Sequence, residues 1–150
     1  MNSSPPDIPY MEAAAEPVTG RPALLGIPFD QTASFRKGAA LGPDAIRQVS
    51  NGLETYSPSL DRDLTSSPFA DLGNLSLHTK DAERVNTLVT EACRNLLSRN
   101  LTPLLLGGEH SFTPGAVAAA LETHPNLMVV QLDAHADLRD ELNGERFSHG

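Results

Sequence analysis

The chain has 150 residues, of which 39% are hydrophobic and 20% are charged, a composition typical of one globular domain with its own core. Its formal net charge of −8 argues against a nucleic-acid partner, which would need clustered lysine and arginine. The single cysteine, Cys93, excludes an intramolecular disulfide and a cysteine-ligated zinc finger. Because no apolar run approaches about eighteen residues, we expect no membrane partner and a cytoplasmic location.

The first segment, residues 1–21, is expected to form a mobile N-terminal arm. It contains four prolines, its acidic residues outnumber its basic ones, and it shows no hydrophobic periodicity. Arms of this kind can also pack against a neighbouring subunit. The folded domain is therefore expected to occupy residues 22–150.

Strand and helix patterns alternate along the rest of the chain. Apolar runs predict buried strands at 23–29, 69–73, 102–106 and 127–132, and helical spacing predicts helices at 42–50, 81–100 and 114–123. The run at 102–106 is too hydrophobic for a half-exposed strand, so we expect layers on both faces of the sheet. The alternation indicates the α/β class, with a parallel sheet in a three-layer αβα arrangement.

Two carboxylates and an imidazole follow the last predicted strand. Asp133, His135 and Asp137 occupy alternate positions, which face one side of an extended backbone. Ligands of α/β proteins bind at the carboxyl ends of parallel strands, and mixed oxygen and nitrogen donors suit Mn²⁺, Fe²⁺, Zn²⁺ or Co²⁺. The same pattern is compatible with a solvated loop whose carboxylates cap a helix or pair with Arg139.

A second histidine segment follows the strand predicted at 102–106. In Gly107-Gly108-Glu109-His110-Ser111, the glycines allow a tight turn and a close approach of the backbone. Taken alone, this segment could be a strand exit with an exposed histidine. Since one helical crossover separates it from Asp133, the two strand ends can be near neighbours and can share a pair of metal ions.

Together these segments resemble the signatures of the ureohydrolase (arginase/agmatinase) family. Gly107–Ser111 is similar to the first signature, with Glu109 where aspartate is usual, and Asp133-Ala134-His135-Ala136-Asp137 matches the second. Ser148-His149-Gly150 resembles the loop that carries the active-site histidine of the family. Segments 26–30, 34–39 and 42–47 look more like agmatinases than arginases, so the resemblance runs from about Ala23 to Gly150.

The resemblance implies a binuclear Mn²⁺ hydrolase that converts a small cationic guanidino substrate to urea and an amine. By position, His110 and Asp137 would bind one ion, His135 would bind the other, and Asp133 would bridge the two. His149 would be the catalytic histidine, and Glu109 would structure its loop rather than bind metal. Agmatine, guanidinobutyrate, other guanidino acids and guanidine stay open as substrates, while arginine is less favoured. A complete member would be expected to form a homo-oligomer, commonly a trimer or hexamer.

A third signature of the family, Ser-x-Asp-x-Asp-x-x-Asp-Pro, is not among these residues. Without it, the ion at His135 would have two protein ligands, against the three that are typical of catalytic sites. The predicted strands are likewise about half of the sheet expected for an arginase-like fold. We therefore expect residues 22–150 to be the N-terminal half of a ureohydrolase domain, poorly stable and inactive in isolation. The alternative is a catalytically inactive metal-binding or regulatory homologue; the signatures disfavour a metal-binding domain of other chemistry.

Overall fold

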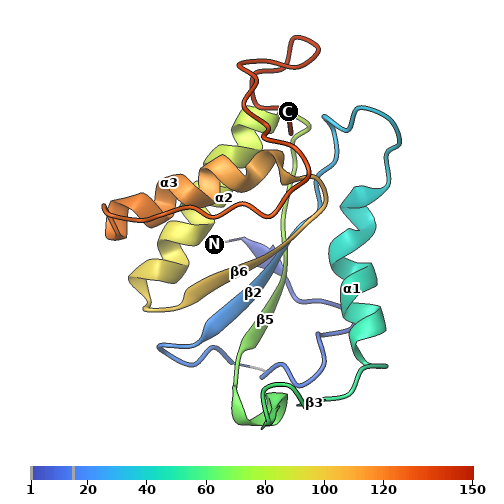
Figure 1. The fold of residues 1–150 in the computed structure, drawn as a ribbon, viewed down its shortest axis with the longest axis vertical. Coiled ribbons are helices and arrows are strands. Elements are labelled where there is room, and N and C mark those ends of the chain that lie inside the picture. The colour runs from blue at the N-terminus through green and yellow to red at the C-terminus, as the bar shows by residue number, and fades with distance from the viewer. Residues whose placement is uncertain (1, 15) are drawn as a thin grey trace.

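The computed structural model describes residues 2–14 and 16–150 and has a four-stranded sheet at its centre (Figure 1). Its strands, in the order β1-β5-β2-β6, are β1 (Ser3–Ser4), β5 (Ala70–Leu75), β2 (Pro22–Ile27) and β6 (Thr102–Gly107). β2 pairs in parallel with both β5 and β6, whereas β1 pairs antiparallel with β5. The parallel core of the predicted sheet is confirmed, and the short β1 makes the complete sheet a mixed one.

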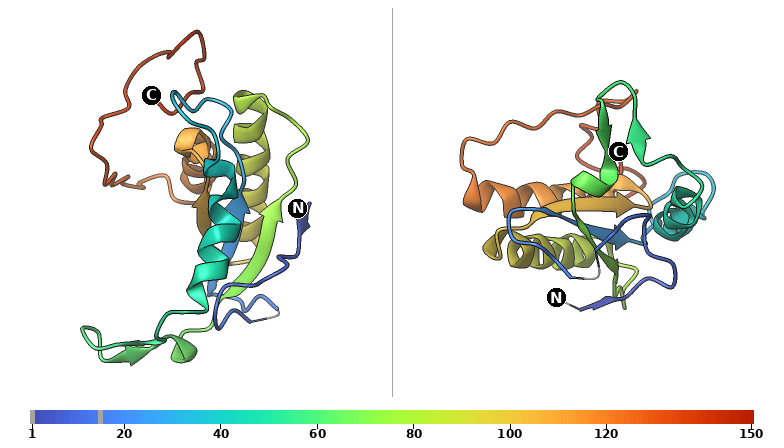
Figure 2. Two further views of the ribbon diagram at one scale, coloured as in Figure 1. Left: turned by 90° about the vertical axis from the view of Figure 1, so that its right-hand side faces the viewer. Right: turned by 90° about the horizontal axis from the view of Figure 1, so that it is seen from below.

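Helices cover both faces of the sheet, as Figures 1 and 2 show. α1 (Gly42–Ser50) lies on one face, and α2 (Ala82–Ser98) and α3 (Thr113–Thr123) pack against each other on the opposite face. Alternate residues of β2 serve the two layers: Leu25 joins the core beneath α2, while a Cβ on Gly26 would lie 3.0 Å from Cβ of Pro43 in α1. The predicted three-layer αβα arrangement is therefore confirmed.

The main hydrophobic core lies between the sheet and α2. The buried positions of α2 recur every three or four residues, which places them on one helical face. The side chain of Asp81 accepts a hydrogen bond from the Arg84 backbone N–H and caps the start of this helix. The buried members of this core are Leu25, Ile27, Phe29, Leu75, Ala82, Val85, Val89, Ala92, Cys93, Phe112 and Ala119.

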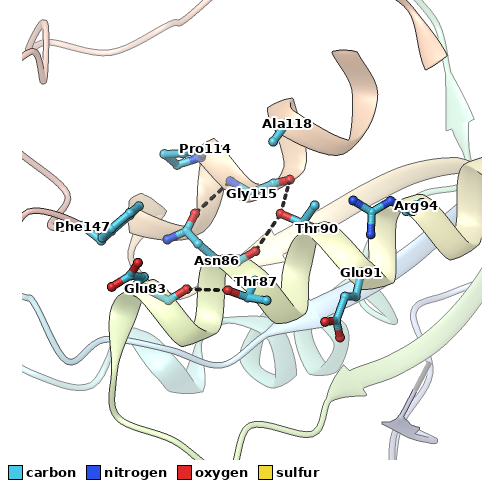
Figure 3. A pocket seen from close by; sticks show the side chains of 10 residues that line it. All are labelled: Glu83, Asn86, Thr87, Thr90, Glu91, Arg94, Pro114, Gly115, Ala118 and Phe147. Atoms are coloured by element: carbon cyan, nitrogen blue, oxygen red, sulfur yellow. Dashed lines mark hydrogen bonds between the residues drawn. The ribbon is translucent and has the colours of Figure 1, made fainter. Parts of the chain in front are cut away.

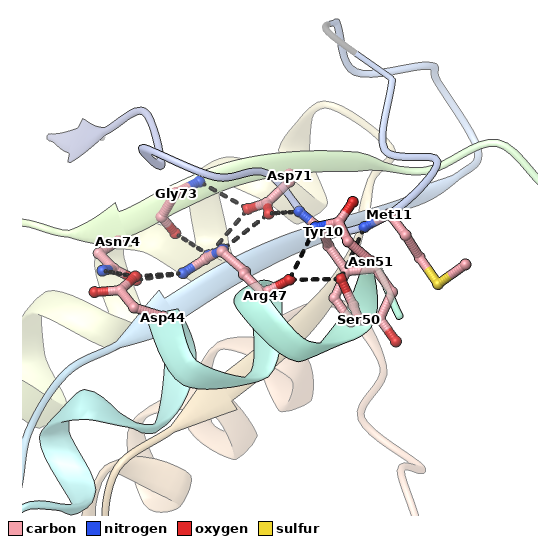
Figure 4. A network of polar contacts seen from close by, with 9 residues as sticks. All are labelled: Tyr10, Met11, Asp44, Arg47, Ser50, Asn51, Asp71, Gly73 and Asn74. Atoms are coloured by element: carbon pink, nitrogen blue, oxygen red, sulfur yellow. Dashed lines mark hydrogen bonds and ion pairs between the residues drawn. The ribbon is translucent and has the colours of Figure 1, made fainter. Parts of the chain in front are cut away.

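A buried arginine joins α1 to β5 (Figure 4). The Arg47 side chain is 1% exposed and forms two hydrogen bonds to the Asp71 carboxylate, at 2.8 Å from Nε and 2.9 Å from Nη2. It also donates to Oδ1 of Asn74 at 2.8 Å and to the Gly73 carbonyl at 2.9 Å. Burial raises the pKa of the Asp71 carboxyl, but the hydrogen bonds from Arg47 and from the Tyr10 and Gly73 backbone N–H groups outweigh it, so the pKa is lowered overall.

The N-terminal segment lies along the β5 edge of the sheet. β1 pairs with the end of β5, the Tyr10 backbone N–H donates to Asp71 at 2.9 Å, and the Met11 N–H donates to Ser50 Oγ at 3.0 Å. These contacts were not expected from a proline-rich sequence without periodicity, because they depend on acceptors supplied by α1 and β5. The division of the chain after residue 21 stays a prediction, as does the mobility of the arm.

One predicted strand is not formed. Residues 127–132 have no regular secondary structure, and Val130 and Leu132 are 75% and 96% exposed. An apolar, β-prone sequence forms a strand only when a neighbour satisfies its backbone hydrogen bonds. β6, which ends the sheet, does not pair with this segment, so the prediction of a fourth parallel strand at 127–132 is wrong for this structure.

The remaining elements are short. β3 (Tyr56–Ser57) and β4 (Arg62–Asp63) form a two-stranded antiparallel sheet between α1 and β5. Three 3₁₀ turns lie at Ala39–Leu41, Leu64–Ser66 and His110–Phe112. Within the described ranges, no helix combines the length and the apolar character needed to cross a membrane.

Candidate metal centre

The ends of β2 and β6 position the first histidine. The two strands are in parallel register, with Ile27 opposite Gly107, so the segments that follow them leave the sheet side by side. The Gly108 N–H donates to the Ile27 carbonyl at 3.1 Å, and the Glu109 N–H donates to the Phe29 carbonyl at 2.8 Å. A Cβ on Gly108 would lie 2.2 Å from that Phe29 oxygen, so only glycine allows the two backbones to approach this closely.

Glu109 connects the loop after β2 to the loop after β6 and is not part of the His110, Asp133 and Asp137 cluster. Its buried carboxylate accepts hydrogen bonds from the Thr32 backbone N–H at 3.0 Å and from the hydroxyls of Thr32 and Ser111, each at 2.7 Å. These contacts confirm that Glu109 structures the loop that leads into His110. The glutamate side chain thus reaches across to Thr32 in the loop after β2.

Hydrogen bonds from α2 hold the other side of the His110 turn and the start of α3 in place; Figure 3 shows those to Gly115. Asn86 Nδ2 donates to the Ser111 carbonyl at 2.8 Å, and Asn86 Oδ1 accepts from the Gly115 N–H at 2.8 Å. Thr90 Oγ1 donates to the Gly115 carbonyl at 3.0 Å. These three hydrogen bonds fix the start of α3 and, with it, the turn that contains His110.

His110, Asp133 and Asp137 converge on one point. One ligand atom from each lies within 4.8 Å of the others, and His110 Nε2 is 3.7 Å from Asp137 Oδ2. Donors around an octahedral ion with bonds of about 2.1 Å lie about 3 to 4.2 Å apart, so the three groups are close to the spacing that one ion requires. One imidazole nitrogen and two carboxylates are a donor set that fits a divalent ion.

His135 does not join this cluster. Its side chain is 82% exposed, and its Nδ1 lies 3.4 Å from Asp133 Oδ1. The prediction that Asp133, His135 and Asp137 face one side assumed an extended backbone. Instead, the chain bends at residues 134–135, where the His135 backbone N–H turns back to Asp133 Oδ1 at 2.8 Å, so Asp133 and His135 do not lie on one extended stretch.

The Asp133 carboxylate accepts a hydrogen bond from its own loop. The His135 backbone N–H donates to Asp133 Oδ1 at 2.8 Å and lowers the pKa of this carboxyl. Desolvation opposes this effect, while the nearby His110 and His135 side chains add to it. Metal binding requires deprotonated ligands, and an aspartate is already ionised at neutral pH, so the lowered pKa matters only in that Asp133 stays available as a ligand to a lower pH.

His149 lies next to the cluster. It lines a cavity of about 500 Å³ together with His110, Asp133 and Asp137. Its ring centroid is 6.0 Å from that of His110 at an interplanar angle of 85°, and its Nδ1 is 3.3 Å from Thr32 Oγ1. The sequence patterns do not single out Thr32, because its contacts are to residues far along the chain. The assignments of His149 as the catalytic residue and of His110, Asp133, His135 and Asp137 as ligands stay predictions.

Fold and cluster together define a class: an α/β protein whose histidine and carboxylate groups gather beyond the carboxyl ends of parallel strands. A model of the arginase family matches residues 21–150, and the chain belongs to that family. This finding confirms the resemblance seen in the sequence motifs.

Individual relatives agree with this membership. The agmatinase of Bacillus subtilis (strain 168) is 40% identical over 126 residues, which are 84% of this chain and 43% of the relative. The N(1)-aminopropylagmatine ureohydrolase of Thermococcus kodakarensis is 40% identical over 136 residues, 89% of this chain and 46% of the relative. The crystal structure of the agmatine ureohydrolase of Thermoplasma volcanium matches with a TM-score of 0.80 and 33% identity, over 94% of this chain and 47% of that one. The chain thus spans just under half the length of the curated relatives it matches.

Proposed function

We propose that this chain is the N-terminal portion of a ureohydrolase that hydrolyses a small guanidino compound to urea and an amine. The observation that carries the proposal is the convergence of His110, Asp133 and Asp137 at one cavity, beside His149, in a member of the arginase family. Agmatine is the favoured substrate because the three relatives described above are named for agmatine or aminopropylagmatine. Guanidinobutyrate, other guanidino acids and guanidine are the alternatives, and arginine is disfavoured.

Two Mn²⁺ ions are the proposed cofactors. His110, Asp133 and Asp137 would hold the first ion, and Asp133 with His135 would contribute to the second once the exposed His135 side chain turns toward the cavity. When bound, Mn²⁺ lowers the pKa of a water molecule and so supplies a nucleophile at neutral pH. The fit is direct for the first ion, while the second needs this rearrangement and further donors.

The residues of the chain supply the remaining chemistry. Carboxylates at the cavity and a net charge of −8 attract a cationic guanidinium group. The departing amine must gain a proton, and His149 lies in the same cavity as the three clustered side chains. We also propose a cytoplasmic homo-oligomer, a trimer or hexamer, for the complete protein.

One observation favours a second candidate, a catalytically inactive metal-binding or regulatory homologue. The spacing of the clustered side chains suits a single ion, and His135 lies outside the cluster. A protein that bound a single ion without the third signature would hold metal but lack a binuclear centre.

Sequencing the transcript across the codon for Gly150 distinguishes the two candidates. If the frame continues into an Asp-x-Asp signature, we expect its product to release urea from agmatine in the presence of Mn²⁺, while residues 1–150 alone release none. A stop codon after Gly150, with no urea from the purified chain, would favour the inactive homologue.

Metal titration tests the cluster directly. We expect His110→Ala, Asp133→Ala and Asp137→Ala each to weaken Mn²⁺ binding at least about tenfold, as loss of a ligand should. His124→Ala is the matched control, since His124 lies at the C-terminus of α3, outside the cluster. Free Mn²⁺ is measured by electron paramagnetic resonance, and wild-type affinity in the His110→Ala variant would refute the assignment.

A further inference from the structure

Thr32 links a buried carboxylate to the histidine of the cavity. Thr32 Oγ1 lies 2.7 Å from Glu109 Oε1 and 3.3 Å from His149 Nδ1, although these partners are 77 and 117 residues away in the sequence. The Thr32 backbone N–H donates to the same carboxylate at 3.0 Å. Two bonds to one carboxylate fix both the backbone and the side-chain rotamer of Thr32, so its hydroxyl has a defined orientation.

A count of hydrogens determines the direction of the bond to His149. A threonine hydroxyl carries one hydrogen, and an ionised carboxylate only accepts. The Thr32 hydroxyl therefore donates its hydrogen bond to Glu109, and only the lone pairs of Thr32 Oγ1 are left to interact with the imidazole of His149. The bond is satisfied only when His149 Nδ1 donates, so the neutral ring carries its proton on Nδ1 and leaves Nε2 as an acceptor.

Nε2 of His149 is then free to accept or return a proton on the side of the cavity. His149 lines the cavity that His110, Asp133 and Asp137 share. A histidine that moves protons works through one nitrogen while a partner on the other nitrogen sets its tautomer and orientation. Here the partner of His149 Nδ1 is the Thr32 hydroxyl, which is itself held by the Glu109 carboxylate.

We propose that Thr32 is a positioning residue that fixes the Nδ1–H tautomer and the orientation of His149, so that Nε2 exchanges protons with the substrate. The catalytic consequence rests on the proposed function, whereas the tautomer does not. The loop from Asp30 to Leu41 is therefore more than a connection between β2 and α1, because it carries the group that orients the histidine.

Nitrogen-15 NMR of histidine-labelled chain, recorded in alkaline buffer where imidazoles are neutral, tests the tautomer without metal or substrate. We expect wild type and Thr32→Ser to show His149 protonated on Nδ1, and Thr32→Val to lose this preference. Val keeps the shape of the side chain but has no hydroxyl. The matched control is Thr65→Val, which removes a threonine–carboxylate bond of 2.6 Å to Asp63 and should leave His149 unchanged.

A wild-type His149 protonated on Nε2, or a Thr32→Val variant that keeps the Nδ1–H form, would overturn the inference. If Thr32→Val does not fold, as judged by circular dichroism, the wild-type and Thr32→Ser spectra decide.

The second measurement is the steady-state kinetics of the protein encoded by the complete reading frame. Thr32→Val should lower kcat about 10- to 100-fold with little change in KM, and Thr32→Ser should restore most of it. Equal losses of kcat in the serine and valine variants would count against a role for the hydroxyl. Absence of hydrolysis in wild type would instead overturn the proposed function, and the NMR spectra alone would then decide the role of Thr32.

Discussion

Replacing Arg47 with methionine tests the polar connection between α1 and β5 shown in Figure 4. Methionine fills much of the same volume but removes the guanidinium that forms two hydrogen bonds to Asp71. The Asp71 side chain is 1% exposed, so the substitution leaves a buried carboxylate without its cation. The Asn74 side chain and the Gly73 carbonyl lose a donor as well.

Breaking a buried ion pair by removing one partner typically costs about 3–5 kcal/mol. Asp71 would still accept hydrogen bonds from the Tyr10 and Gly73 N–H groups, which reduce the penalty. We therefore expect Arg47→Met to lower the free energy of unfolding by about 3 kcal/mol, at the lower end of that range. Adding Asp71→Asn removes the uncompensated charge, so the double variant should lose less stability than Arg47→Met alone.

Urea unfolding followed by far-ultraviolet circular dichroism measures these differences. Arg94→Met is the matched control, because it makes the same substitution in an ion pair with Glu122 whose side chains are 52% and 49% exposed. Exposed pairs contribute about 0–1 kcal/mol, so this variant should change little. The reasoning is refuted if Arg47→Met costs no more than Arg94→Met, or if the double variant is less stable than the single one.

The pKa of Asp71 is lowered in the folded state. Its contribution to stability is therefore present above the unfolded-state pKa of about 3.9 and is lost as the pH falls through the lower, folded value. In urea titrations, acid should destabilise wild type more steeply than Asp71→Asn. Gly108→Ala should lower the free energy of unfolding by about 1–3 kcal/mol and weaken Mn²⁺ binding, because the new Cβ would meet the Phe29 carbonyl. Gly52→Ala, whose Cβ would lie 3.5 Å from the Val49 carbonyl, should behave as wild type. Equal unfolding midpoints for the two variants would contradict this. Burial raises the pKa of Cys93 to about 11, so its thiol should react with a disulfide reagent at pH 8 far more slowly in the native chain than in urea, and equal rates would show that it is accessible.

The helices and the paired parallel strands were predicted well from the sequence. α2 begins one residue after its capping Asp81, and α1 occupies the expected residues 42–50 with Pro43 in its first turn. The parallel strands β2 and β6 follow their apolar runs to within two residues. The segment 127–132 carries a signal of the same kind but forms no strand, because a strand depends on a neighbour that its own residues do not specify.

The same contrast holds for the candidate site. His110, Asp133 and Asp137 could be grouped in advance from the spacing of their two motifs, although only His110 follows a strand, β6, and the strand expected before Asp133 is not formed. His135 could not be placed correctly, since the rule of alternate faces fails at the bend between Asp133 and His135. Thr32 could not be foreseen either, because its role depends on contacts with loops far away in the sequence.

The position of β6 at the end of the sheet has a practical consequence for anyone who purifies this chain. A strand at a sheet edge offers backbone donors and acceptors to any extended segment of another molecule, and the chain also exposes the β-prone side chains of Val129, Val130 and Leu132. Pro103 within β6 lacks an amide hydrogen and so interrupts the row of donors that such pairing uses. We expect aggregation that increases with protein concentration in spite of the net charge of −8, and folding at high dilution or with a chaperone should raise the yield of monomer.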